Sequence, residues 1–154
     1  MTSHSKSIWD TLLLTAQRKS GAAHNIMQKA ELRRRQAMGR REKIEQLLLE
    51  YSSRLCALQS KDHSKAEVTN YRQFIAQLQD IHQRTDNEIK SAILECERAK
   101  SLLIIAEQER LKHQKLVKRE AQRQEKEQNN IDMKTLDAQS MIQFNINTKT
   151  HQQR

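Results

Sequence analysis

No proline occurs in this chain of 154 residues, and its two glycines are Gly21 and Gly39. Both residue types mark turns, so their scarcity predicts very long helices rather than a fold with many turns. Aromatic residues make up 3% of the chain and charged residues 31%. This composition argues against an enzyme with a deep, aromatic-lined pocket. We therefore predict an all-α protein whose function depends on what contacts its helices.

A first long helix is predicted from about residue 7 to residue 59. Ser7 can cap its first turn, and Asp10 suits the positive end of the helix dipole. Residues spaced alternately by four and three positions then form the pattern of a coiled-coil seam with basic interruptions. The predicted seam is Leu12, Ala16, Lys19, Ala23, Ile26, Ala30, Arg33, Ala37, Arg40, Ile44, Leu47, Tyr51, Arg54 and Leu58.

A turn is predicted at about residues 60–64, followed by a second helix at about residues 65–144. The stretch from Gln59 to Lys65 has no apolar side chain, and Ser64 with Glu67 forms a capping box. One uninterrupted helix is the alternative. The second seam is Tyr71, Ile75, Leu78, His82, Thr85, Ile89, Ala92, Cys96, Ala99, Leu103, Ala106, Arg110, His113 and Val117.

These two helices predict an antiparallel coiled-coil hairpin that forms a single domain over residues 1–154. With a turn near residue 62, the numbers of facing residues add up to about 124. The first helix then runs out near Val117, where the apolar pattern of the second helix also stops. Residues 119–130 are polar on all sides, so we expect a C-terminal helical overhang. Residues 145–154 are expected to be a flexible tail.

The sequence offers little chemistry. Its six histidines have no metal-site spacing, and Cys56 and Cys96 form no CxxC motif and would lie too far apart for a disulfide. It has no phosphate-binding loop and no nucleophile motif. We therefore predict a protein that is not an enzyme, with no catalytic residue, metal or cofactor. The absence of a signal peptide or a spanning segment leads us to expect a cytosolic protein.

A basic cluster in the first helix is the strongest electrostatic feature. The chain has a net charge of +9, and the first 59 residues carry +6 of it. The cluster consists of Arg33, Arg34, Arg35, Arg40 and Arg41. It is compatible with a solvated helix face, an acidic partner protein or, less economically, DNA. A DNA-binding leucine zipper would need a longer leucine heptad repeat after the basic segment.

An additional apolar stripe flanks the seam near the turn. Phe74, Leu78 and Ile81 share one face of the second helix, since they are spaced by four and three residues. The hairpin register places them beside Ile44, Leu47 and Tyr51. This patch is either a wider core near the turn or a partly exposed docking surface, in which Phe74 and Tyr51 are the expected anchors.

At these residues the sequence resembles a known family. The segment from Asn70 to Leu78, Asn-Tyr-Arg-Gln-Phe-Ile-Ala-Gln-Leu, follows Tyr51 and a polar turn, and residues 128–137 form a polar tail. This order is similar to that of the FliJ family of flagellar type III export proteins.

The resemblance implies an antiparallel coiled-coil stalk that enters the ring of the export ATPase FliI and promotes ring assembly. It implies further contacts with the ATPase regulator FliH, the export gate FlhA and export chaperones, at the cytoplasmic face of the inner membrane and without nucleic acid. The residues matching gate-contacting positions are Ile44, Leu47, Tyr51, Phe74, Leu78 and Ile81. Leu47 replaces a commoner aromatic residue. The ATPase-facing part would include the arginines of residues 33–41. Alternatives are the stalk of a virulence injectisome and a basic coiled coil that binds nucleic acid.

Overall fold

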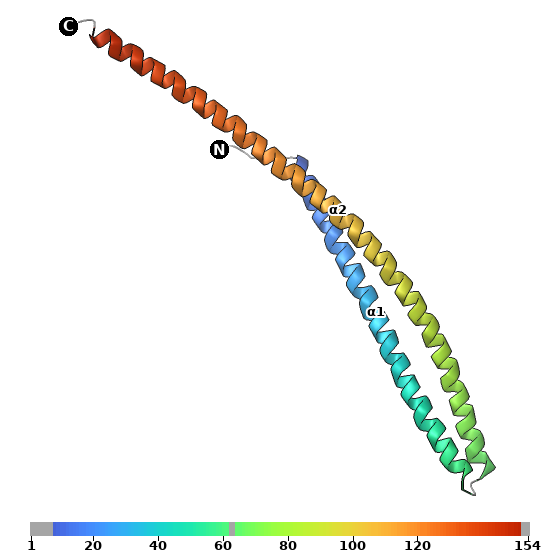
Figure 1. The fold of residues 1–154 in the computed structure, drawn as a ribbon. Helices are drawn as coiled ribbons and strands as arrows, with labels where there is room; N and C mark the ends of the chain where they lie inside the picture. Colours follow the sequence, from blue (N-terminus) through green and yellow to red (C-terminus); the bar gives the residue numbers. More distant parts are fainter. Residues whose placement is uncertain (1–7, 62–63, 152–154) are drawn as a thin grey trace. The chain divides into compact units, whose positions relative to one another are not determined.

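The computed structural model describes residues 8–61 and 64–151, and this part of the chain is all-α (Figure 1). Helix α1 spans Ile8–Gln59 and helix α2 spans Lys65–His151. The two long helices pack against each other, which confirms the predicted helical hairpin. The predicted cap at Ser7 lies outside the described residues.

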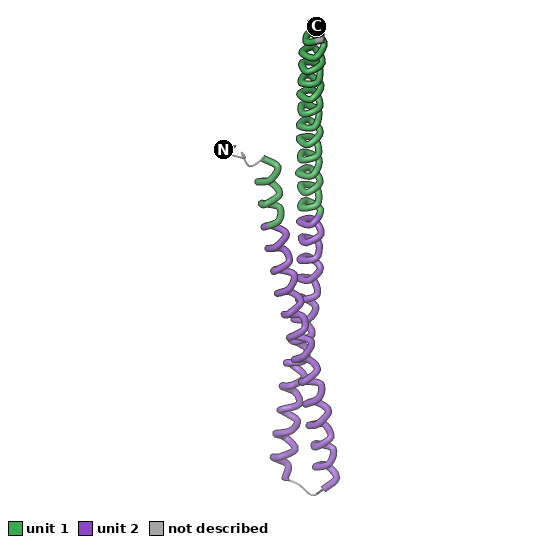
Figure 2. The backbone as a smooth tube through the Cα atoms, turned by 90° about the vertical axis from the view of Figure 1, so that its left-hand side faces the viewer, with its two compact units in different colours: residues 1–17, 108–154 green, residues 18–107 purple. Residues whose placement is uncertain are grey.

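The chain divides into two compact units, which Figure 2 shows in two colours. Unit 2 comprises residues 18–107, and unit 1 comprises residues 1–17 and 108–154. Unit 2 contains most of α1, the turn and the first half of α2. Unit 1 contains the beginning of α1 and the second half of α2. The expectation of a single domain stays a prediction.

Hydrogen bonds end α1 and begin α2 on either side of the turn. The Ser60 hydroxyl donates to the Ala57 carbonyl at 2.8 Å, which satisfies one carbonyl of the last turn of α1. At the start of α2, the Glu67 amide donates to the Ser64 hydroxyl oxygen at 3.4 Å. The predicted cap at Ser64 is therefore present. The alternative of one uninterrupted helix is wrong, because α1 ends at Gln59 and α2 begins at Lys65.

The core of unit 2 is a seam of small side chains. Ala23, Ala30 and Ala37 of α1 are buried at seven-residue intervals. They face buried residues of α2, and Ala30, Cys96 and Ala99 form one cluster with the half-buried Met27. Short side chains allow two helix backbones to approach closely, so the core of unit 2 is narrow in this stretch.

The second seam position of α1 differs from the prediction by one residue. Met27 and Leu48 are half-buried, whereas the predicted Ile26 and Leu47 are exposed. The observed seam steps four residues and then three from each alanine, which turns Lys19, Arg33 and Arg40 toward solvent. The same shift places Arg34 and Arg41 half-buried at the seam instead. In α2, all 14 predicted seam residues are buried or half-buried, which confirms that seam.

The end of α2 in unit 1 is helical but has no covering partner. Every residue from 121 to 150 is exposed. The helix nevertheless extends to His151, so the predicted helix end near residue 144 is wrong. The flexibility of the tail stays a prediction. Thr148 donates to the Phe144 carbonyl at 3.0 Å and Thr150 to the Ile146 carbonyl at 3.2 Å. Residues 121–151 contain no proline or glycine, so nothing in the local sequence stops the backbone hydrogen bonds of the helix. Neither helix of the described chain has a stretch apolar and long enough to cross a membrane.

Candidate partner-binding surfaces

The predicted basic cluster of α1 lies in unit 2 against acidic residues of α2. Arg33 pairs with Glu95 at 3.2 Å, and Arg40 pairs with Glu88 at 2.5 Å. Both pairs are exposed, so each contributes little stability by itself. Their repetition at the same register nevertheless places carboxylates beside the predicted basic surface.

Arg34 and Arg35 differ in their surroundings. Arg34 is half-buried at the seam and donates to Glu31 of its own helix at 2.9 Å. This hydrogen bond to a carboxylate raises the pKa of Arg34. Arg35 is exposed and has no ion-pair partner within the described residues. Arg35 is thus the member of the cluster that forms no ion pair among the described residues.

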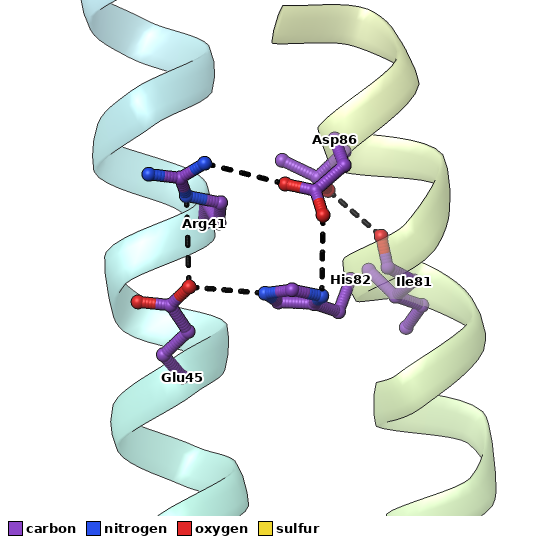
Figure 3. A network of polar contacts seen from close by, with 6 residues as sticks. Arg41, Glu45, Ile81, His82 and Asp86 are labelled. Carbon is purple, nitrogen blue, oxygen red and sulfur yellow. Dashed lines mark hydrogen bonds and ion pairs between the residues drawn. The ribbon is translucent and has the colours of Figure 1, made fainter.

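Arg41 belongs to a closed polar network between the two helices (Figure 3). It lies 3.4 Å from Asp86 of α2 and 3.6 Å from Glu45 of α1. His82 completes the ring, with Nε2 3.0 Å from Glu45 and Nδ1 3.7 Å from Asp86. Two cationic or ionisable nitrogen groups therefore alternate with two carboxylates, so the network fixes the local register of the hairpin.

The ion pairs show that part of the positive charge of the basic cluster is neutralised within the chain itself. The sequence predicts an acidic surface for these arginines to bind, and in unit 2 much of that surface is α2 of the same chain. The residue numbers add up to 127 for Arg41 with Asp86 and for Glu45 with His82. The predicted sum of about 124 was therefore close but too small for these pairs. Whether the cluster contacts an ATPase stays a prediction.

The structure places the six predicted gate-contacting residues around one end of unit 2. Phe74, Leu47 and Ile81 are exposed, whereas Leu78 is 5% exposed and belongs to the core. Ile44 and Tyr51 are half-buried. We call the exposed surface of Leu47, Tyr51, Phe74 and Ile81 the aromatic patch. Leu78 supports this patch from beneath rather than offering its own side chain to a partner.

Two further residues of α2 extend the aromatic patch toward the turn. The Tyr51 ring centroid lies 4.5 Å from that of Phe74 and 5.9 Å from that of Tyr71. Asn70 lines a shallow hollow together with these three rings. The Arg54 guanidinium lies 5.3 Å from the Tyr51 ring centroid, a cation–π distance. The sequence predicted Tyr71 as a seam residue. Its ring contact with Tyr51 shows that it also borders the aromatic patch.

Histidines, cysteines and carboxylates outside these surfaces are the remaining candidates for a chemical site. The described part of the chain has no group of three His, Cys, Asp or Glu residues that could hold a metal ion. Cys56 is a free, exposed thiol and Cys96 a free, buried one. Burial, followed by the nearby Glu31, raises the pKa of the Cys96 thiol, so this sulfur stays protonated and unreactive near neutral pH.

Comparison with known proteins identifies the family. The family model described as "Flagellar FliJ protein" matches residues 9–149. No curated protein and no solved structure matches the chain. The match covers nearly the whole of α1 and α2 and includes the aromatic patch and the exposed end of α2. The chain therefore belongs to the FliJ family, and with it to the components of the flagellar protein export apparatus.

Proposed function

We propose that this protein is a non-enzymatic stalk of the flagellar export apparatus. In this role it binds the export ATPase FliI, with its regulator FliH, promotes assembly of the ATPase ring and couples the ring to the export gate FlhA. It also escorts export chaperones. The protein would work in the cytoplasm, at the cytoplasmic face of the inner membrane through its contacts with the apparatus. Family membership and two exposed surfaces support this proposal.

The observation that carries the proposal is the exposed, apolar end of α2. Between residues 131 and 146, seven large apolar side chains are each 56–68% exposed. They are Ile131, Met133, Leu136, Met141, Ile142, Phe144 and Ile146. So much exposed apolar surface on one helix marks an interaction site.

The arrangement of these side chains indicates the shape of the partner. Ile131 and Ile142 are eleven residues apart, as are Met133 and Phe144, and eleven residues make about three helical turns. Each pair therefore lies along one side of α2. The two pairs are offset by two residues, or about 200° around the helix axis, so they point to opposite sides. A helix that is apolar on opposite sides fits a partner that surrounds it rather than a groove on one side.

An ATPase ring is such a surrounding partner. The central opening of a ring could cover both sides of α2 at once and bury all seven side chains. Each fully buried side chain of this size contributes about 1.5–3 kcal/mol, before the cost of ordering is subtracted. The polar stretch before residue 131 is held as a helix by its own side-chain pairs, such as Arg123 with Glu127 at 2.9 Å.

The aromatic patch supports the second part of the proposal. Phe74 is 37% exposed and Ile81 is 46% exposed, so both can add buried area when a partner binds. Tyr51 holds Phe74 by ring contact, so the patch is ordered before binding and loses little side-chain entropy. We propose that this surface contacts the export gate.

Two alternatives are less well supported. A nucleic-acid-binding coiled coil would use the basic cluster, but Arg33, Arg40 and Arg41 already pair with acidic residues of α2. The stalk of a virulence injectisome would share the hairpin architecture. The match of residues 9–149 to the flagellar family favours the flagellar system.

The shape argument can be tested with substitutions on the two sides of α2. Ile131→Ser with Ile142→Ser changes one side, and Met133→Ser with Phe144→Ser changes the other. We expect each double variant to weaken binding of the full-length protein to FliI and to reduce stimulation of FliI assembly. Leu49→Ser is a control, because Leu49 is an exposed apolar residue of α1 in unit 2.

Loss of binding in one double variant alone would indicate a one-sided groove and contradict an enclosing ring. No loss in either variant would contradict the assignment of this segment to the ATPase. Circular dichroism of each variant checks that α2 remains helical, since serine lowers helix propensity only slightly at these exposed positions.

A further inference from the structure

Unit 1 contains a second basic cluster, on α2, which the sequence prediction did not single out. Between residues 111 and 119 the chain has four lysines and arginines and no aspartate or glutamate. They are Lys112, Lys115, Lys118 and Arg119, and all four are exposed. We call these four residues the cationic face.

In the part of the chain that the structure describes, the cations of the cationic face have no ion pairs with carboxylates, unlike most arginines of the cluster of α1. The nearest acidic residues along α2 are already engaged, since Glu109 lies 3.5 Å from His113 and Glu120 lies 2.7 Å from Arg123. Within the described residues, none of the four cations has an ion-pair partner. The cluster of α1 is denser in the sequence, but its charge is largely matched by carboxylates. Within the described residues, the cationic face therefore brings together four neighbouring cations without an ion pair, whereas the cluster of α1 has one such residue, Arg35.

The geometry makes the face a single surface. Lys112, Lys115 and Arg119 follow the spacing i, i+3, i+7, which places them on one side of a helix. Together with Leu111 and Leu116 they line a shallow hollow on α2. The seam residues His113 and Val117 of the same segment are half-buried. The cations therefore lie on the side of α2 that the seam leaves free.

We propose that the cationic face binds an acidic protein surface on the partner that encloses the end of α2. Arg119 precedes Ile131 by twelve residues, or about 18 Å along the helix. Carboxylates around the opening of an enclosing partner would meet the cations as the apolar end enters. The attraction would steer α2 into the opening and set how far it enters. This inference rests on the proposed function, which supplies the ATPase as the enclosing partner.

The two leucines favour a protein over a membrane or a nucleic acid. A helix that binds a membrane surface presents a broad apolar side to the lipid, with cations flanking it. Here Leu111 and Leu116 lie among the cations, and no broad apolar side is free in this segment. DNA would place phosphates against these leucines, and residues 111–119 contain no Phe, Tyr or Trp that could stack on a base. A protein surface that mixes carboxylates with apolar side chains matches both features.

The test compares two triple variants with the same change in charge. The first is Lys112→Gln with Lys115→Gln and Arg119→Gln, in the cationic face. The matched control is Lys43→Gln with Lys90→Gln and Arg98→Gln, at exposed cations of unit 2 that have no ion-pair partner in the described structure. Binding of each full-length protein to FliI is measured at low and at high salt.

We expect the first variant to bind FliI about tenfold more weakly at low salt, with the difference shrinking at high salt. The control should bind like the wild type. Equal binding by the first variant and the wild type would overturn the inference and leave the proposed function standing. A wild type that does not bind FliI at either salt concentration would instead contradict the proposed function, and this inference with it.

Two further probes separate the partner classes. The wild type is tested against vesicles containing phosphatidylglycerol and against a short DNA duplex. If either probe binds more tightly than FliI, and the first triple variant loses that binding, the cationic face belongs to a lipid or a nucleic acid and the inference is wrong. Weak binding of both probes, unchanged between the two variants, supports a protein partner.

Discussion

The ring of Phe74 on α2 lies 4.5 Å from the ring of Tyr51 on α1, at an interplanar angle of 57°. This tilted contact joins the two helices into one aromatic surface. Such ring pairs contribute about 0.5–1.5 kcal/mol beyond their buried area. The contact therefore holds the exposed Phe74 ring in place before any partner arrives.

Removing the Phe74 ring should weaken the gate contact without unfolding the hairpin. We expect Phe74→Ala to reduce affinity for FlhA by about 2 kcal/mol or more, roughly 30-fold, because ordered aromatic anchors dominate interfaces. The effect is measured by titration calorimetry with a soluble portion of FlhA. Leu78→Ala is a poor substitute, because Leu78 is buried and its loss would leave a cavity. Wild-type affinity in the Phe74 variant would remove the aromatic patch from the gate contact.

Enlarging the alanine seam should destabilise the hairpin. Ala30 is 5% exposed and packs in one cluster with Cys96 and Ala99. We expect Ala30→Leu to lower the free energy of unfolding by about 1–3 kcal/mol, because a longer side chain would force the helices apart. Urea unfolding followed by circular dichroism measures this change. Ala22→Leu, at an exposed position of α1, is the control and should change stability by less than about 0.5 kcal/mol.

The ion pairs between the helices predict a charge-swap rescue. In the wild type, the Arg40 guanidinium lies 2.5 Å from the Glu88 carboxylate. Arg40→Glu would place a second carboxylate next to Glu88. The repulsion should lower stability by about 0.2–1 kcal/mol, as expected for an exposed pair. Adding Glu88→Arg restores opposite charges and should recover most of the loss. A double variant no more stable than the single one would show that this pair does not contribute to the register.

The two thiols should react at very different rates. Cys56 is exposed, whereas burial raises the pKa of Cys96. We expect a thiol reagent at neutral pH to label Cys56 quickly and Cys96 slowly, and to label both equally in urea. Because the pKa of Cys96 is raised in the folded state, its contribution to stability is present at neutral pH and is lost as the pH rises into the alkaline range. Equal labelling in the native protein would contradict a buried Cys96.

Acid should loosen the exposed part of α2 near Arg123. Hydrogen bonds from Arg123 lower the pKa of Glu120 below its usual range. A lowered pKa in the folded state means that this pair stabilises the helix above the usual carboxylate range and loses its effect as the pH falls through the lowered value. Glu120→Gln removes the carboxylate that becomes protonated. We therefore expect the helix near Arg123 to lose less helicity on acidification in this variant than in the wild type. Nuclear magnetic resonance of residues near Arg123 in the full chain measures it, with Glu125→Gln as the control.

Sequence patterns predicted α2 better than α1 for a physical reason. The seam of α2 contains Leu78, Ile89 and Cys96, which differ clearly from their polar neighbours, so the periodic pattern has one solution. In α1 the alanines fix one seam position, but Ile26 and Met27 are both apolar and adjacent. The sequence could not decide which of them faces α2, since that depends on the rotation of α1 against its partner.

The partners of the arginines were beyond sequence prediction for a related reason. A shift of three or four residues in register changes which carboxylate meets Arg40, and the length of an arginine side chain adds to the uncertainty. Charge counts alone therefore indicated an external acidic surface where α2 supplies much of it. The uncompensated charge at Lys112 and Arg119 became visible only after the ion pairs were assigned.

The alanine seam also gives the chain an unusual response to mutation. In most cores, shortening a side chain leaves a cavity, so losses come from truncation. Ala23, Ala30 and Ala37 have almost nothing to lose, and nearly every replacement of them is larger. In this stretch of unit 2, random substitutions should destabilise the protein by overpacking the core rather than by creating cavities. Selection would then keep these positions small even if no partner ever touches them.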